Sequence, residues 1–207
     1  MNLRIIIFGI SIILSSCMHS QQDPEPRLVG GPCEGCEAVL EYPGELNAID
    51  TLPGFDSAEN KLKVSGTIFK PDGVTPAEGV VLYLHHTNAE GIYPAKEGEK
   101  GWADRHGYLR GWIKTGEDGR YTFFTEIPGS YPDGRNPAHI HPFILEPDGK
   151  YYYLSAYFFE DDPLFTDNHQ EDPPCGSNGV VKLQQGDGMS LIERNFVLGS
   201  GVPGYKK

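Results

Sequence analysis

Apolar and polar residues alternate along the chain in a pattern typical of β-strands. The segment 62–69 alternates with a period of two, which places its apolar side chains on one face of a strand. The segment 80–85 is apolar almost throughout, which favours a strand covered on both faces. Further strands are predicted at 110–115, 120–124, 138–145 and 151–159, with turns rich in Pro, Asp and Gly between them. Strands at this spacing predict an all-β fold, a β-sandwich.

Two details of this pattern predict how the strands connect. The turn Glu117-Asp118-Gly119 lies between 110–115 and 120–124 and indicates that these strands pair as a hairpin. The aromatic-rich segment 151–159 is expected to form one strand. Helical periodicity is confined to at most a turn near 56–62.

The N-terminal segment has the pattern of an export signal. Arg4 precedes an apolar run from Ile5 to Leu14, which is shorter than the ~20 residues that a membrane-spanning helix needs. Leu14-Ser15-Ser16-Cys17 resembles a bacterial lipobox, so residues 1–16 are predicted to be a lipoprotein signal peptide and Cys17 the lipidated residue. An ordinary signal peptide with a chance cysteine is the alternative.

The rest of the chain is predicted to be a tether followed by one domain. Residues 17–32 are polar and proline-containing, as expected of a flexible tether, and residues 33–207 suffice for one domain. The formal net charge is −12 and no basic cluster is present, which argues against nucleic acid as a partner. Membrane association would then rest on the lipid anchor alone, in a bacterial cell envelope.

Three cysteines remain after Cys17. In an exported protein a disulfide is the default, either between Cys33 and Cys36 or between one of them and Cys175. The sequence-based prediction is the pair Cys36 and Cys175.

The run Pro137-Ala138-His139-Ile140-His141 carries the candidate chemistry. On a strand, His139 and His141 share a face while Ile140 packs the other way, so two imidazoles form a chelate. Zn or Cu could use this pair, and it could also be incidental. A phenol from Tyr131, just upstream, adds a hard anionic oxygen once ionised and favours Fe(III).

In order and spacing, the motifs around this run resemble those of the intradiol ring-cleavage dioxygenases, the catechol and protocatechuate family. The motifs are Asn88-x-x-Gly91-x-Tyr93, Leu109-Arg110-Gly111, Asp118-Gly119-Arg120-Tyr121-Thr122-Phe123, Pro128-Gly129-x-Tyr131 and Pro137-Ala138-His139-Ile140-His141. The resemblance runs from about residue 66 to 163 and implies an immunoglobulin-like or prealbumin-like sandwich with long loops carrying the site. It also implies a non-haem Fe(III) with Tyr93 and His139 as equatorial ligands and Tyr131 and His141 as axial ligands.

The activity implied by the resemblance is insertion of O2 into a catechol-type aromatic, with ring cleavage between the hydroxyl-bearing carbons. Fe(III) lowers a phenol pKa far below its free value of about 10, and Tyr131 would act as both ligand and proton acceptor. The family usually has arginine directly before Pro-Ala-His, whereas this chain has Asn136 there and Arg135 one position earlier, so Arg135 is the candidate second catalytic residue.

The remaining candidates line the substrate or support the site. Arg110, Trp102 and Tyr108 are expected to contact substrate, whereas His85 and His86 are expected to pack near the centre. His106 and His169 lack a partner motif and are expected on the surface. The strand after the histidine pair also lacks the family's usual glutamine. An inactive β-sandwich lipoprotein that binds a ligand or a protein is therefore the alternative function.

Overall fold

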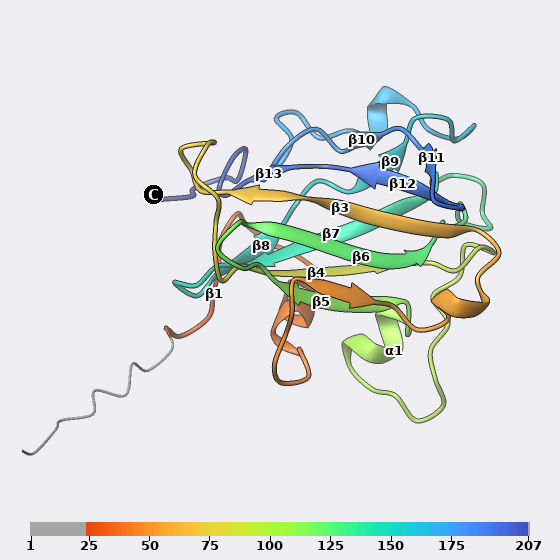
Figure 1. Ribbon diagram of the computed structural model, residues 1–207, viewed down its shortest axis with the longest axis horizontal. Coiled ribbons are helices and arrows are strands. Elements are labelled where there is room, and N and C mark those ends of the chain that lie inside the picture. The colour runs from red at the N-terminus through yellow and green to blue at the C-terminus, as the bar shows by residue number, and fades with distance from the viewer. Residues whose placement is uncertain (1–23, 207) are drawn as a thin grey trace, which may run out of the picture.

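The structure is a computed structural model that describes residues 24–206 as a two-sheet sandwich (Figure 1). The predicted signal peptide and Cys17 lie outside the described residues. No helix within residues 24–206 is both long and apolar enough to cross a membrane. The predicted all-β sandwich is confirmed.

The first sheet carries the candidate histidines. Its main path runs β1–β8–β7–β4–β5, β9 pairs with β7, and β10 pairs with β9. The bounds are β1 (Arg27–Leu28), β4 (Val81–His86), β5 (Arg110–Lys114), β7 (His139–Leu145), β8 (Lys150–Tyr153), β9 (Tyr157–Phe159) and β10 (Val180–Val181).

The second sheet closes the other side of the core. Its path runs β11–β12–β3–β6–β2, and β13 pairs with β3. The bounds are β2 (Ile49–Thr51), β3 (Lys61–Phe69), β6 (Arg120–Glu126), β11 (Gln184–Gly186), β12 (Met189–Glu193) and β13 (Phe196–Val197).

Short helices supplement the sheets. They are the 3-10 helices η1 (Cys36–Leu40), η2 (Phe55–Ser57) and η3 (Asp167–His169) and the α-helix α1 (Trp102–His106). The strand β4 is buried along its whole length, as its apolar run predicts. Its Leu82 and Leu84 enter the core between the sheets, whereas Val81 and Tyr83 pack on the outer face in a second cluster with η1. The 3-10 helix η1 therefore covers part of the outer face of the first sheet, and the candidate site lies on the same face.

The predicted hairpin between 110–115 and 120–124 is wrong, because the two strands lie in different sheets. β5 pairs with β4, whereas β6 pairs with β3 and β2. The turn between them crosses the sandwich, so the apolar faces of both strands point into one core that includes Ile113, Tyr121 and Phe123. A hairpin would have set those faces side by side in one sheet. The single strand predicted at 151–159 is also divided, into β8 and β9.

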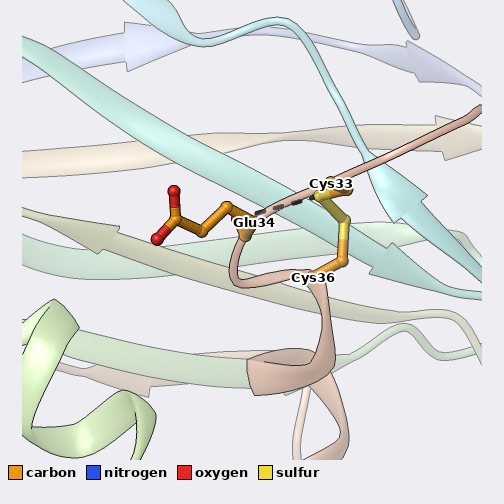
Figure 2. Close-up of a disulfide and its surroundings, with 3 residues drawn as sticks. All are labelled: Cys33, Glu34 and Cys36. Carbon is orange, nitrogen blue, oxygen red and sulfur yellow. Dashed lines mark hydrogen bonds between the residues drawn. A yellow bond between two sulfur atoms is a disulfide. The ribbon is translucent and has the colours of Figure 1, made fainter.

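The predicted Cys36–Cys175 disulfide is wrong, because the structure joins Cys33 to Cys36 (Figure 2). Cys36 lies in the outer cluster, whereas Cys175 lies in the core between the sheets, so the first sheet separates them. The Cys175 thiol is free and buried, 3.5 Å from the carbonyl oxygen of Gly201.

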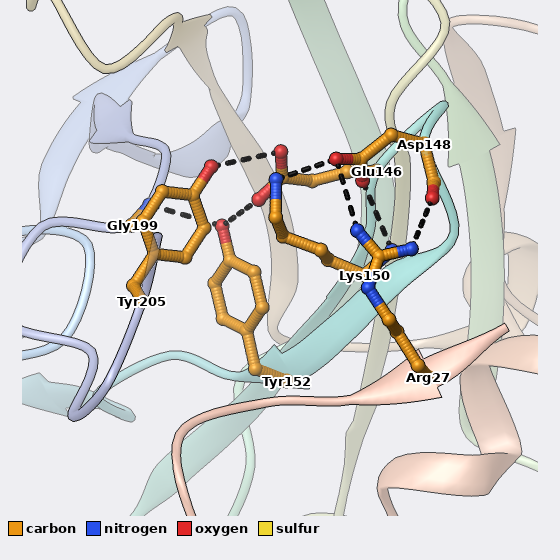
Figure 3. Close-up of polar contacts among 7 residues, drawn as sticks. All are labelled: Arg27, Glu146, Asp148, Lys150, Tyr152, Gly199 and Tyr205. Atoms are coloured by element: carbon orange, nitrogen blue, oxygen red, sulfur yellow. Dashed lines mark hydrogen bonds and ion pairs between the residues drawn. The ribbon is translucent and has the colours of Figure 1, made fainter. Parts of the chain in front are cut away.

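Part of the predicted tether belongs to the packed domain. Residues 27–28 form β1, which pairs in parallel with β8, and Arg27 reaches Asp148 in the turn between β7 and β8. Figure 3 shows the buried carboxyl of Glu146 next to this turn, where it accepts hydrogen bonds from the hydroxyls of Tyr152 and Tyr205 at 2.8 and 3.0 Å. The domain therefore begins before residue 33, the predicted boundary.

Candidate metal centre

The strand β7 presents His139 and His141 on one face. Ile140 between them is fully buried in the core, and the two imidazole ring centroids lie 4.5 Å apart on the outer face. This confirms the face assignment made from the alternation of residues. The Nδ1 atom of His139 lies 2.7 Å from the carbonyl oxygen of Pro137. Because that carbonyl can only accept, Nδ1 carries the proton and Nε2 keeps the lone pair that a metal needs.

Two tyrosines from separate loops converge on the histidines. The hydroxyls of Tyr93 and Tyr131 are 2.8 Å apart, and the Tyr131 ring centroid lies 5.1 Å from that of His139. Tyr93 follows β4, and Tyr131 lies in the loop between β6 and β7. The structure therefore brings together all four of the metal ligands that the sequence predicts.

Two glycines allow these loops to interlock. A Cβ on Gly91 would lie 2.0 Å from the carbonyl oxygen of Ser130, and one on Gly129 would lie 2.2 Å from that of Ala89. Gly91 also has a φ of 76°, in the left-handed region that favours glycine. The carbonyl oxygen of Asn88 accepts the backbone N–H of both glycines, at 3.0 and 2.8 Å. The two motifs that carry the tyrosines therefore form one packed unit.

Asp162 is hydrogen-bonded to both ends of the loop that carries Tyr131. Its Oδ2 accepts hydrogen bonds from the Ser130 hydroxyl and from the Ala138 backbone N–H, both at 2.8 Å. Ser130 precedes Tyr131 and Ala138 precedes His139, so one carboxylate holds both ligand-bearing segments. Asp162 is not among the residues predicted from the sequence, because its two partners lie 32 and 24 residues earlier in the chain and only the fold brings them to it.

Burial sets the protonation states of the four side chains. It raises the pKa of Tyr93, and the nearby Tyr131 raises it further; burial also raises the pKa of Tyr131. Burial lowers the pKa of His139 and, together with His139, that of His141. Both imidazoles are therefore neutral at neutral pH and able to coordinate, whereas both phenols ionise only if a cation compensates their charge.

Two further histidines extend the cluster over the outer face. The register of β4 and β7 sets His85 opposite His141, with ring centroids 4.7 Å apart, and His85 stacks on His106 at 3.8 Å. The Nδ1 of His85 is buried without a hydrogen-bond partner. His106 is buried too, against the surface prediction, and its Nδ1 lies 2.8 Å from the Tyr83 hydroxyl.

His86 has a structural role on the other face of β4. Its two ring nitrogens lie 2.7 Å from the Thr87 carbonyl oxygen and 2.7 Å from the Thr125 hydroxyl, so neither is free for a metal. This agrees with the packing role expected from the sequence.

A cavity of about 290 Å³, here called the ligand cavity, opens beside the tyrosines. Its lining combines three of the four predicted ligands with residues of α1 and the disulfide loop: Glu34, His85, Tyr93, Trp102, Arg105, His106, Tyr131, His141 and Phe143. A second cavity of about 370 Å³ adjoins it, and Glu34, His141 and Phe143 line both.

The structure places one of the three predicted substrate contacts at the ligand cavity. Trp102 lines it, whereas Arg110 is ion-paired with Glu41 at 3.0 Å and Tyr108 has the Lys96 ammonium over its ring. Arg135 is exposed on the Tyr131 loop, and neither cavity is lined by Arg135, Arg110 or Tyr108. The arginine that does line the ligand cavity is Arg105.

The donor set fits a hard trivalent cation. No group of three or more His, Cys, Asp or Glu side chains within residues 24–206 is arranged to hold a metal ion. A metal at this centre therefore needs the phenol oxygens of Tyr93 and Tyr131 as well as the imidazoles. Two phenolates and two neutral imidazoles suit Fe(III) better than the softer divalent ions.

Comparison with known proteins finds two curated relatives. No protein-family model matches the chain. It is 30% identical to catechol 1,2-dioxygenase 1 of Acinetobacter lwoffii over 203 residues, covering 86% of this chain and 63% of the relative. It is also 30% identical to hydroxyquinol 1,2-dioxygenase of Rhizobium sp. (strain MTP-10005), covering 76% of this chain and 55% of that relative. The chain is thus similar in sequence to a catechol 1,2-dioxygenase and a hydroxyquinol 1,2-dioxygenase, and it spans roughly three fifths of the length of these relatives.

Solved structures of this class share the fold. The dioxygenase domain of a carbohydrate-binding fusion protein from Streptomyces sp. SirexAA-E has a TM-score of 0.56 at 23% identity, covering 85% of this chain and 98% of that one. Catechol 1,2-dioxygenase of Acinetobacter radioresistens has a TM-score of 0.58 at 18% identity, covering 80% of this chain and 63% of that one.

Proposed function

We propose that this chain is a non-haem Fe(III) intradiol dioxygenase that opens the ring of a catechol-type aromatic with O2. The observation that carries the proposal is the convergence of Tyr93 and Tyr131 with His139 and His141 beside a cavity, in a homologue of catechol and hydroxyquinol dioxygenases. Bound Fe(III) would supply Lewis acidity and one-electron chemistry to a chelated catechol.

The protein's own residues prepare the site for that substrate. The hydroxyls of Tyr93 and Tyr131 are hydrogen-bonded to each other, and either one can be the donor. Tyr131 is the proton acceptor that we assign: it lines the ligand cavity, and its phenol oxygen, once ionised, could accept the proton of a substrate hydroxyl. Trp102 and Phe143 offer apolar faces for an aromatic ring.

The experiment combines colour with oxygen consumption. The full chain is loaded with iron, its visible spectrum is recorded, and O2 uptake is measured with catechol and with hydroxyquinol. We expect a burgundy protein, from tyrosinate-to-iron charge transfer, and a ring-opened diacid that contains both atoms of O2. The Tyr131→Phe variant should lose most of the activity, whereas Tyr42→Phe, which alters an exposed tyrosine, should retain it. A colourless iron-loaded protein that consumes no O2 would favour the ligand-binding alternative.

We also propose that the protein is exported and anchored to the cell envelope through a lipid on Cys17. The support is the sequence signature Leu14-Ser15-Ser16-Cys17 behind an apolar segment. Labelling of the expressed protein with radioactive palmitate tests this, with Cys17→Ser as the comparison. Equal labelling of the two proteins would exclude Cys17 as the anchor.

A further inference from the structure

Glu34 and Arg105 form an ion pair at the ligand cavity. Arg105 Nη2 lies 2.5 Å from Glu34 Oε1, and both side chains line the cavity that Tyr131 also lines. Their side chains are 74% and 58% exposed, so the pair lies where the cavity meets solvent. An exposed pair of this kind contributes little to stability.

The fold positions this pair through two separate elements. Glu34 lies between Cys33 and Cys36, and Figure 2 shows its side chain pointing away from the disulfide that closes the loop. Gly35 lets the loop settle on α1, because its φ is 85° and a Cβ there would lie 2.7 Å from His106 Nε2. On α1, the Arg105 guanidinium lies over the ring of Trp102, 5.1 Å from its centroid. Both charges are therefore held beside the cavity.

These two side chains carry the fixed charge of the cavity lining. The other lining residues are aromatic side chains and histidines. Among the residues that line the ligand cavity, Glu34 is the one carboxylate and Arg105 the one guanidinium, and the two lie side by side.

We propose that the Glu34–Arg105 pair selects the ring substituent, so that the site accepts catechols with uncharged rings and disfavours those that carry a carboxylate. This inference rests on the proposed function and adds the substrate class. A ring carboxylate would meet the like charge of Glu34, while the guanidinium that could bind it is already paired. An uncharged ring is not repelled by Glu34 and does not need the Arg105 guanidinium for binding.

Removing the charge of Glu34 and removing the charge of Arg105 change this selection in opposite directions. In Glu34→Gln the guanidinium of Arg105 is free to bind a ring carboxylate through two parallel hydrogen bonds. In Arg105→Met the carboxylate of Glu34 is left without its partner and repels anionic rings more strongly. The double variant lacks both charges and should return toward wild-type selection.

The test measures the ratio of kcat/KM for protocatechuate, which carries a carboxylate, to kcat/KM for catechol. We expect Glu34→Gln to raise the ratio about fivefold to tenfold, which corresponds to roughly 1 kcal/mol between partly screened charges, and Arg105→Met to lower it by a similar factor. The control variants are Asp118→Asn and Arg120→Met, which alter an exposed ion pair elsewhere in the structure and should leave the ratio unchanged.

Calorimetric titration of each variant with the two ligands, without O2, measures the same ratio from binding alone. Equal changes for both ligands in Glu34→Gln, or an equal shift in Asp118→Asn, would overturn the inference. If the binding ratio shifts as expected while no variant opens either ring, the charge selection stands and the proposed dioxygenase activity fails. The two conclusions are therefore tested separately.

Discussion

Substitution of Gly35 by alanine tests how the disulfide loop is held on α1. Gly35 is buried, has a φ of 85°, and its missing Cβ would lie 2.7 Å from Nε2 and 2.8 Å from Cε1 of His106. His106 has little freedom to yield, because its ring stacks on His85 and its Nδ1 is hydrogen-bonded to the Tyr83 hydroxyl. An alanine therefore meets both an unfavourable backbone conformation and a constrained ring.

The magnitude follows from these two effects. A left-handed conformation costs a residue with a Cβ about 1–2 kcal/mol relative to glycine. Displacing the His106 ring also breaks its hydrogen bond to Tyr83, which adds about 1 kcal/mol. We expect Gly35→Ala to lower the free energy of unfolding by about 2–3 kcal/mol in total.

Gly44→Ala is the matched control for the backbone effect alone. Gly44 has a φ of 88°, and nothing lies within 4 Å of the position that a Cβ would occupy there, so only the first cost of about 1–2 kcal/mol applies. Urea denaturation with the disulfide intact measures both variants. Equal losses of stability in Gly35→Ala and Gly44→Ala would show that the loop does not rest on His106, and would remove the physical basis for the position of Glu34.

Three further predictions concern the ligand loop, a buried carboxyl and the cysteines. Asp162→Ala should weaken iron retention against a chelator by about tenfold to a hundredfold, because the Tyr131 loop loses its hydrogen bonds to Asp162 at both ends. Asp161→Ala, which alters the exposed neighbouring residue, should leave iron retention unchanged. Burial raises the pKa of Glu146 above 4.5, so its contribution to stability is complete below that pH and declines as pH rises through the folded-state value. Glu146→Gln should therefore gain in Tm relative to the wild type as pH rises; a constant difference in Tm refutes this. Alkylation of the unfolded domain without a reductant should label Cys175, whereas Cys33 and Cys36 should be labelled only after a reductant is added. Mass spectrometry measures the labelling, and labelling of Cys33 without a reductant would contradict the assigned disulfide.

Local periodicity was sufficient to predict the strands β3, β4, β5, β6 and β7 and the orientation of the histidines. Successive side chains of a strand point to opposite faces, so the order His139-Ile140-His141 alone implies two imidazoles on one side and a core residue on the other. The same rule predicted the one-sided burial of β3. Both predictions hold because they depend only on residues adjacent in sequence.

Pairing between strands required the tertiary structure. The short turn at 117–119 suits a hairpin, yet β5 pairs with β4 and β6 pairs with β3, so the two strands bury their apolar faces in one core from opposite sheets. The disulfide depends on the same layering, since the first sheet lies between the cluster that holds Cys36 and the core that holds Cys175. Neither fact can be read from sequence spacing.

For the candidate centre, the sequence by itself determined the donor chemistry, namely two imidazoles and two phenols whose motifs resemble those of one enzyme family. Tertiary structure alone decided which charged residues face the cavity: Arg105 with Glu34, rather than Arg110 or Arg135. The physical reason is the range of the interactions involved. Ligand types follow from residue identity and the local backbone, whereas the surroundings of a cavity are set by contacts between segments far apart in the chain, such as the 71 residues that separate Glu34 from Arg105.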